Sequence, residues 1–315
     1  MQRATTVLRA GLAAMLLAAL SACADLGILG PTGAIAPMTP KAALPVETPR
    51  SAAARAYYAQ IQTALLTQGL LRTDGGGRDT PFDARMLADN FLRIAMFDEY
   101  ARDASGPVQR ETESRLRRWD APVRVGLRFG ASVAGDVQAT DRARVASYLA
   151  RLSTLTGHPI SLVDTAPNFW IYIVAEEERE ALGPAVNATL RGLSPGDVAG
   201  ITDMPRSTYC LVYALSKGTS GVYDRAFAVV RAEHPDLLRL SCLHEEIAQG
   251  LGLANDSPRA RPSIFNDDEE FALLTRQDEL MLRMLYNPAF RPGMTEAEAR
   301  PIAEALASEL LGGES

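Results

Sequence analysis

Residues 244 to 256 hold the densest group of side chains capable of chemistry, in the order His-Glu-Glu-Ile-Ala-Gln-Gly-Leu-Gly-Leu-Ala-Asn-Asp. The pair His244-Glu245 begins like the zinc-binding sequence H-E-x-x-H, whose two histidines lie four residues apart on one helix face. That frame fails, because position 248 is an alanine. His244 instead falls on an apolar helical stripe with Leu240, Ile247 and Leu251. A histidine on such a stripe is more often a hydrogen-bonded core residue than a ligand.

A frame shifted by one residue places oxygen-bearing side chains where the motif has its histidines. Glu245 and Gln249 stand at the two histidine places, and Glu246 stands in the position of the general base. Asn255 and Asp256 follow within two turns. Carboxylate and amide oxygens suit hard cations and bind zinc far less well than imidazole does. The pattern predicts a cleft with no metal and no other cofactor, in which Glu246 is the candidate catalytic residue.

The hydrophobic pattern predicts the scaffold that must position these residues. Strands are expected where apolar residues alternate or run together, at 123–129, 160–163, 169–174, 209–215 and 226–232. An amphipathic helix is expected up to Gly157, and the motif helix from about Pro235 to Leu253. Residues 111–315 are therefore expected to form one α+β domain with a mixed, twisted sheet.

Two more helices are expected before this domain, within residues 51–110. The first carries Tyr58, Ile61 and Leu65 on one face, and the second has an apolar stripe that includes Leu87 and Phe91. Because each has only one apolar face to bury, we expect the two to form a helical pair beside the main domain.

The motif and the order of these elements resemble the metzincin metallopeptidases, which have a zincin-like fold. The segment 250–253, Gly-Leu-Gly-Leu, is similar to the x-L-G-L that follows H-E-x-x-H in that family, where a glycine turns the chain so that a third ligand returns to the metal. Asn255 takes this third-ligand place, and residues 274–286 resemble the helix that closes the metzincin domain. The resemblance implies a zincin-like α+β fold whose three ligand places, Glu245, Gln249 and Asn255, all lack histidine.

From about Ser51 to its end, the chain also resembles an uncharacterised domain-of-unknown-function family of bacterial predicted lipoproteins. The likeness rests on the E-E-x-x-Q-x-L-G-L-x-N-D segment, on Met204-Pro205-Arg206-Ser207-Thr208 and on residues 262–267, Pro-Ser-Ile-Phe-Asn-Asp. No activity is established for that family, so the resemblance implies membership and no chemistry.

Residues 1–22 have the three parts of a bacterial lipoprotein signal peptide. Two arginines precede an apolar run at 10–20, and Leu20-Ser21-Ala22-Cys23 matches the lipobox. The run is too short to span a bilayer, so lipid on Cys23, including a palmitate-type acyl chain, is the expected membrane attachment. Because Asp25 does not directly follow Cys23, the periplasmic face of the outer membrane is favoured over the inner membrane.

Residues 23–50 are rich in proline and are expected to form a disordered tether. The net charge of −6 and the lack of a basic patch argue against nucleic acid as a partner. Cys210 and Cys242 remain in a compartment where disulfides persist. Both a bridge between them and two separate buried thiols stay open at this point.

Three functions are compatible with these features. The first is a binding or scaffolding lipoprotein whose peptidase-like cleft holds a peptide or another cell-envelope component. The second is an atypical metal-dependent hydrolase or peptidase with Glu246 as general base, and the third is a purely structural motif. The missing imidazoles favour the first over an enzyme, because a glutamate without a metal activates water poorly.

Overall fold

The computed structural model of this chain describes residues 45–103 and 106–312. The predicted signal peptide, Cys23 and all but the last residues of the predicted tether lie outside the described residues. Within the described part of the chain, no helix is both long and apolar enough to cross a membrane.

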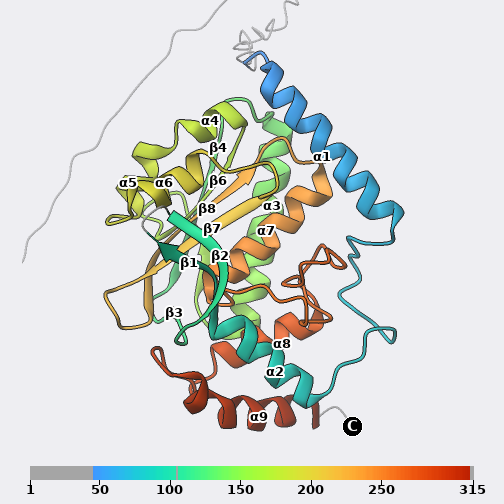
Figure 1. Cartoon of the computed structure of the whole chain (residues 1–315), viewed down its shortest axis with the longest axis vertical. Helices are drawn as coiled ribbons and strands as arrows, with labels where there is room; N and C mark the ends of the chain where they lie inside the picture. The colour runs from blue at the N-terminus through green and yellow to red at the C-terminus, as the bar shows by residue number, and fades with distance from the viewer. Residues whose placement is uncertain (1–44, 104–105, 313–315) are drawn as a thin grey trace, which may run out of the picture. The chain divides into compact units, whose positions relative to one another are not determined.

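The centre of the fold is an open, mostly parallel sheet (Figure 1). Its strands are β3 (Arg118–Trp119), β4 (Val123–Phe129), β5 (Ile160–Leu162), β6 (Phe169–Val174), β7 (Cys210–Ser216) and β8 (Val222–Arg231). β5, β4, β6 and β8 are parallel neighbours in that order, and β3 adds a short parallel pairing with β8. β7 pairs antiparallel with the other side of β8, and β8 is its only partner among the described strands. One antiparallel edge strand therefore makes an otherwise parallel sheet mixed.

Helices cover both faces of the sheet (Figure 1). They are α1 (Pro49–Thr67), α2 (Ala84–Ala95), α3 (Gly135–Thr156), α4 (Glu176–Glu180), α5 (Gly183–Thr189), α6 (Pro195–Thr202), α7 (Asp236–Leu251), α8 (Arg276–Leu285) and α9 (Glu296–Gly312). A separate antiparallel hairpin is formed by β1 (Phe97–Asp103) and β2 (Gly106–Glu113).

The central strand β6 shows why the sheet is buried on both sides. Phe169, Ile171 and Ile173 point into the larger hydrophobic core, which includes α2, α3, α7 and α8. Trp170 and Tyr172 pack against the smaller core, which includes α5 and α6. Side chains of a strand alternate between its two faces, so a strand that is apolar throughout needs cover on both.

The strands predicted from the sequence are confirmed, with β4 and β6 at the predicted bounds. Residues 97–110 were expected to belong to a helical segment, and residues 111–113 to the main domain. Residues 97–103 and 106–113 instead form the two strands of the β1–β2 hairpin. The predicted pairing of the first two helices is not confirmed, since α1 packs mainly on α4, and α2 packs mainly on α9 and α8.

Burial explains why the two N-terminal helices go to different places. α2 buries a broad apolar stripe that includes Leu87, Phe91 and Ile94, and this stripe belongs to the main core. α1 buries only Ser51, Ala54 and Tyr58, and the last two meet Leu238 at the start of α7. A helix with so small a buried face is held largely by polar contacts, such as the hydrogen bond from Ser51 Oγ to Glu233 Oε1 at 2.7 Å.

Candidate functional site

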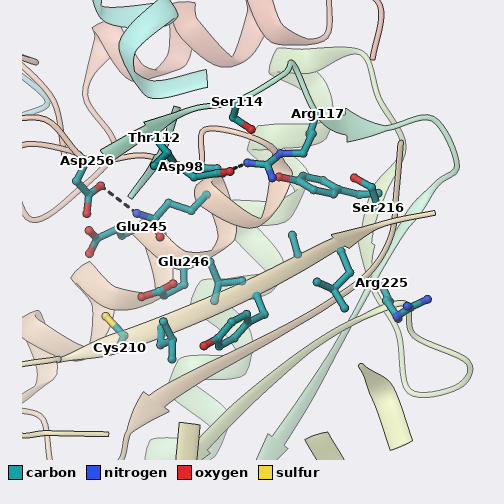
Figure 2. A pocket seen from close by; sticks show the side chains of 18 of the residues that line it. Asp98, Thr112, Ser114, Arg117, Cys210, Ser216, Arg225, Glu245, Glu246 and Asp256 are labelled. Atoms are coloured by element: carbon teal, nitrogen blue, oxygen red, sulfur yellow. Dashed lines mark hydrogen bonds and ion pairs between the residues drawn. The ribbon is translucent and has the colours of Figure 1, made fainter. Parts of the chain in front are cut away.

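A cavity of about 1360 Å³ lies beside β7 and α7, and Figure 2 shows part of its lining. Of the residues singled out from the sequence, Glu245, Glu246, Gln249, Asp256 and Cys210 line it. The structure thus brings the motif helix, the loop after it and the edge strand together around one space. We refer to this space as the cleft.

The cleft runs along one edge of strand β7. All seven residues of β7 line the cleft. Val212 and Ala214 pack toward the main core, whereas Tyr213 and Leu215 pack toward the smaller one. Since these side chains alternate between the faces of the sheet, a space that touches all seven residues must run along the edge that β8 does not occupy.

Two glycines let α7 lie where its side chains can reach the cleft. A Cβ atom on Gly250 would come within 2.5 Å of the Phe169 ring, so only glycine allows the helix to approach β6 this closely. Gly252 follows the last residue of α7 with φ +127°, and a Cβ there would meet Arg117 O at 2.3 Å. Gly252 therefore ends the helix just before the predicted end at about Leu253, and it directs the chain toward Asp256.

The residues at the positions that align with the motif's metal ligands make contacts of two kinds. Gln249 Nε2 donates to Asp256 Oδ1 at 2.9 Å, and both residues line the cleft. Asn255 does not line the cleft: it is buried, its Nδ2 donates to Arg93 O at 2.9 Å, and its backbone N–H donates to Ile94 O at 3.1 Å. Asn255 thus fastens the loop after α7 to the end of α2, because its side chain turns inward from the cleft.

His244 is a core residue, as its place on the apolar stripe indicated. Its ring stacks on Tyr148 at 3.9 Å between centroids, and its Nδ1 accepts from the backbone N–H of Leu274 at 3.3 Å. Burial, with a smaller contribution from Arg151, lowers its pKa to about 3. The ring is therefore neutral at physiological pH and serves as a hydrogen-bond acceptor inside the core.

The donor set of the cleft does not fit zinc. Zinc sites in proteins use imidazole nitrogen or thiolate sulfur for most of their ligands. Here the amide of Gln249 is engaged with Asp256, and Asn255 and His244 face other partners. Across residues 45–103 and 106–312, no three His, Cys, Asp or Glu side chains are grouped so that they could hold a metal ion.

A buried aspartate in α8 shapes the loop that supplies two further cleft carboxylates, Asp267 and Glu269. The Asp278 carboxylate accepts from Ser263 Oγ at 2.6 Å and from the Ile264 backbone N–H at 3.1 Å, and it also forms a capping box with Thr275. Burial raises the pKa of Asp278 to about 6. These bonds fasten both ends of the loop 265–274 to α8. The loop in turn positions Asp267 and Glu269 at the cleft.

Glu269 is a cleft carboxylate with a raised pKa. Burial, and then the negative charges of Asp268 and Asp267, raise its pKa to about 7. Its backbone is in the left-handed region, with φ +57°, a conformation that side chains other than glycine seldom adopt. Its backbone O accepts from the Leu71 N–H at 2.9 Å, which ties the loop to the chain after α1.

A disulfide joins Cys210 to Cys242, with a Cα–Cα distance of 5.9 Å. It connects the first residue of β7 to α7, one turn before Glu245 and Glu246. The two alternatives that the sequence left open are thus resolved in favour of the bridge. The disulfide fastens the edge strand β7 to the motif helix α7 at the Cys210 end of the cleft.

Sequence reasoning missed the basic part of the cleft. Four arginines line it, namely Arg115, Arg117, Arg191 and Arg225. They come from three separate segments, and no local spacing links them. Figure 2 shows Arg117 and Arg225 on one side of the view, with Glu245, Glu246 and Asp256 on the other.

Comparisons with known proteins identify a family without a known activity. The sequence profile described as "Protein of unknown function (DUF2927)" matches residues 84–305. No curated protein and no solved structure shows a significant match to the chain. The matched range starts at the first residue of α2 and includes the sheet, the cleft and most of α9.

Proposed function

This chain belongs to the DUF2927 family of proteins of unknown function, and we propose that it is a binding protein whose cleft takes up an extended polypeptide segment. The observation that carries the proposal is the β7 edge, which borders the cleft along all seven residues and pairs with no other described strand. The unpaired main-chain groups of such an edge bind an extended peptide as an additional strand.

The size of the cleft supports a peptide over a small molecule. Sites for small ligands measure roughly 300–1,000 Å³, and this cleft has about 1360 Å³. Its length along β7 is about 20 Å, from six steps of about 3.3 Å each. An extended segment of about seven residues has that length.

We propose further that the cleft is that of a zincin-like fold that has lost its metal ligands. The element order supports this origin: strand β4, helix α3, strands β5 and β6, hairpin β7–β8 and motif helix α7. The end of α8 also holds the end of α7, because Tyr286 Oη donates to Leu251 O at 3.0 Å. In this proposal Glu245, Gln249 and Asp256 contact the bound segment in place of a metal.

Binding to the cleft is tested by filling it with a bulky side chain. Half-buried Ala254 lines the cleft, and Ala254→Trp should weaken binding of fluorescent heptapeptides to the full chain by about tenfold or more, through steric exclusion. Exposed Ala143 on α3 is the matched control, because it is not a lining residue and Ala143→Trp should leave affinity unchanged. Equal affinity of the two variants would contradict a peptide site in this cleft.

The alternative function is a hydrolase with Glu246 as general base. Its basis is that Glu246 lines the cleft although its side chain is almost wholly buried. That function predicts cleavage of bound peptides, lost in Glu246→Gln with the fold and peptide affinity retained. The binding proposal predicts intact peptides after prolonged incubation with the wild-type chain, as judged by mass spectrometry.

The proposed setting is the cell envelope, with the protein attached through lipid on Cys23 and the cleft facing the periplasm. The support is the signal-peptide pattern of residues 1–23. Cys23→Ser should block signal-peptide processing and abolish incorporation of labelled palmitate. Normal processing of that variant would contradict the lipid anchor.

A further inference from the structure

Charged side chains are divided between the two ends of the cleft. Six acidic and four basic residues line it. Contacts of β7 and its neighbours place four of the six acidic residues near Cys210 and three of the four basic ones near Ser216. Figure 2 shows the same separation among the labelled side chains.

The acidic end lies at Cys210. The disulfide holds Cys210 against Cys242, and Glu245 and Glu246 follow Cys242 within about one turn of α7. Glu269 faces the same end, next to Tyr209, the residue before Cys210. Burial and then the negative charge of Glu269 raise the pKa of Tyr209. Asp267 is two residues from Glu269 on the same anchored loop.

The basic end lies at Ser216. Arg225 is the register partner of Leu215 across the β7–β8 pair, and its guanidinium donates to Arg191 O at 3.2 Å. Arg117 lies over the ring of Tyr223 at 5.9 Å, and Tyr223 is the register partner of Ser216. Asp98, the sixth acidic lining residue, pairs with Arg117, and Asp224 pairs with Arg225 at 3.0 Å. The other two lining arginines, Arg115 and Arg191, leave the basic end with an excess of positive charge.

We infer that the segment bound along β7 carries a cationic side chain at the Cys210 end and an anionic side chain at the Ser216 end, about six residues apart. This inference rests on the proposed function and names the chemistry of its ligand. The β7 edge supplies hydrogen bonds that any extended peptide can use, so the two charged ends select among sequences. Lysine or arginine fits the carboxylate end, and aspartate or glutamate fits the arginine end.

Four blocked heptapeptides with one common Val/Thr/Ser core test this inference on the full chain. One has Lys and Asp at its two ends, one Lys at both, one Asp at both, and one Gln at both. The Lys/Asp peptide should bind about five-fold more tightly than the other three at low salt. This advantage should shrink at high salt, where partly exposed charges are screened.

Single charge reversals at exposed lining residues assign each preference to its end. Asp267→Lys should make the Asp/Asp peptide the best ligand, and Arg191→Glu should make the Lys/Lys peptide the best. Both residues are exposed, so the fold should tolerate the changes. Exposed Glu309 on α9 lies outside the cleft, and Glu309→Lys should leave the order of the four affinities unchanged.

The outcomes separate this inference from the proposed function. If the four peptides bind equally and Ala254→Trp weakens all of them, the cleft binds peptides and the charge inference is overturned. If none binds, the proposed function fails and the inference fails with it. A Lys/Asp preference that neither reversal alters would also overturn the assignment of the charges to the two ends.

Discussion

The two faces of α7 place neighbouring residues in different environments, the hydrophobic core and the cleft. His244, Ile247 and Leu251 face the core, where burial keeps the His244 ring neutral. Glu245 and Gln249 face the cleft, and the amide of Gln249 is bonded to another cleft residue. One helix therefore separates the residues that pack in the core from those that line the cleft. Changes on one face should affect stability, and changes on the other should affect binding.

The largest effect is expected on the core face. Ile247 is fully buried, and Ile247→Ala should lower the free energy of unfolding by about 4 kcal/mol, because it removes packed methyl groups and leaves a cavity. Glu245→Ala on the cleft face should lower it by less than about 1 kcal/mol. Urea unfolding followed by circular dichroism measures both. A cost above about 2 kcal/mol for Glu245→Ala would mean that this face is structural too.

A somewhat smaller effect is expected from the link between α7 and β7. Replacing Cys210 and Cys242 together by alanine should lower the free energy of unfolding by about 3 kcal/mol, because the bridge closes a loop with a sequence separation of 32. Reductant should destabilise the wild-type chain by a similar amount and leave the double variant unaffected. A wild-type chain insensitive to reductant would contradict the bridge.

A smaller effect is expected from titration in the cleft. Glu269 has a pKa of about 7, and the titratable groups facing it are the carboxylates of Asp268 and Asp267 and the neutral phenol of Tyr209. As pH rises from 6 to 8, Glu269 loses its proton and the acidic end becomes more negative, so affinity for the Lys/Asp peptide should rise about threefold. In Glu269→Gln this rise should be absent. An affinity that falls over this interval in the wild-type chain would contradict the placement of Glu269.

The same shift has a consequence for stability with the opposite sign. The folded chain binds a proton on Glu269 more tightly than the unfolded chain, whose glutamates have a pKa near 4.5. Between about pH 4.5 and 7 this group therefore makes stability fall as pH rises. The stability of Glu269→Gln should lack this contribution. Its melting temperature minus that of the wild-type chain should therefore increase as pH rises from 5 to 7. A difference between the two that does not change with pH would contradict the raised pKa.

Local sequence patterns were enough to predict most of the sheet and the motif helix. The strands β4 and β6 have clear apolar patterns, and Gly252 gives a clear end to α7. The hairpin at 97–113 was missed because its residues are mostly charged or small and show no alternation. The partners of α1 and α2 depend on tertiary packing, which helical periodicity alone does not show.

The candidate site was predicted only in part, for a related reason. Glu245, Glu246, Gln249 and Asp256 belong to one short segment, so their spacing revealed them. Asn255 has a polar side chain, as Gln249 and Asp256 have, and its spacing alone does not show that it turns toward Arg93. The arginines come from separate parts of the chain, and only the folded sheet brings them to one end of the cleft.

The most direct test of the account is amide hydrogen exchange of β7 in the full chain, followed by NMR with and without the Lys/Asp heptapeptide. In an antiparallel pair, alternate residues of β7 direct their N–H groups toward β8 and away from it. A peptide added as a strand should slow exchange at every second residue of 210–216, those whose N–H groups point away from β8. Saturating peptide with unchanged exchange along β7, or with protection confined to other elements, would contradict binding along this edge.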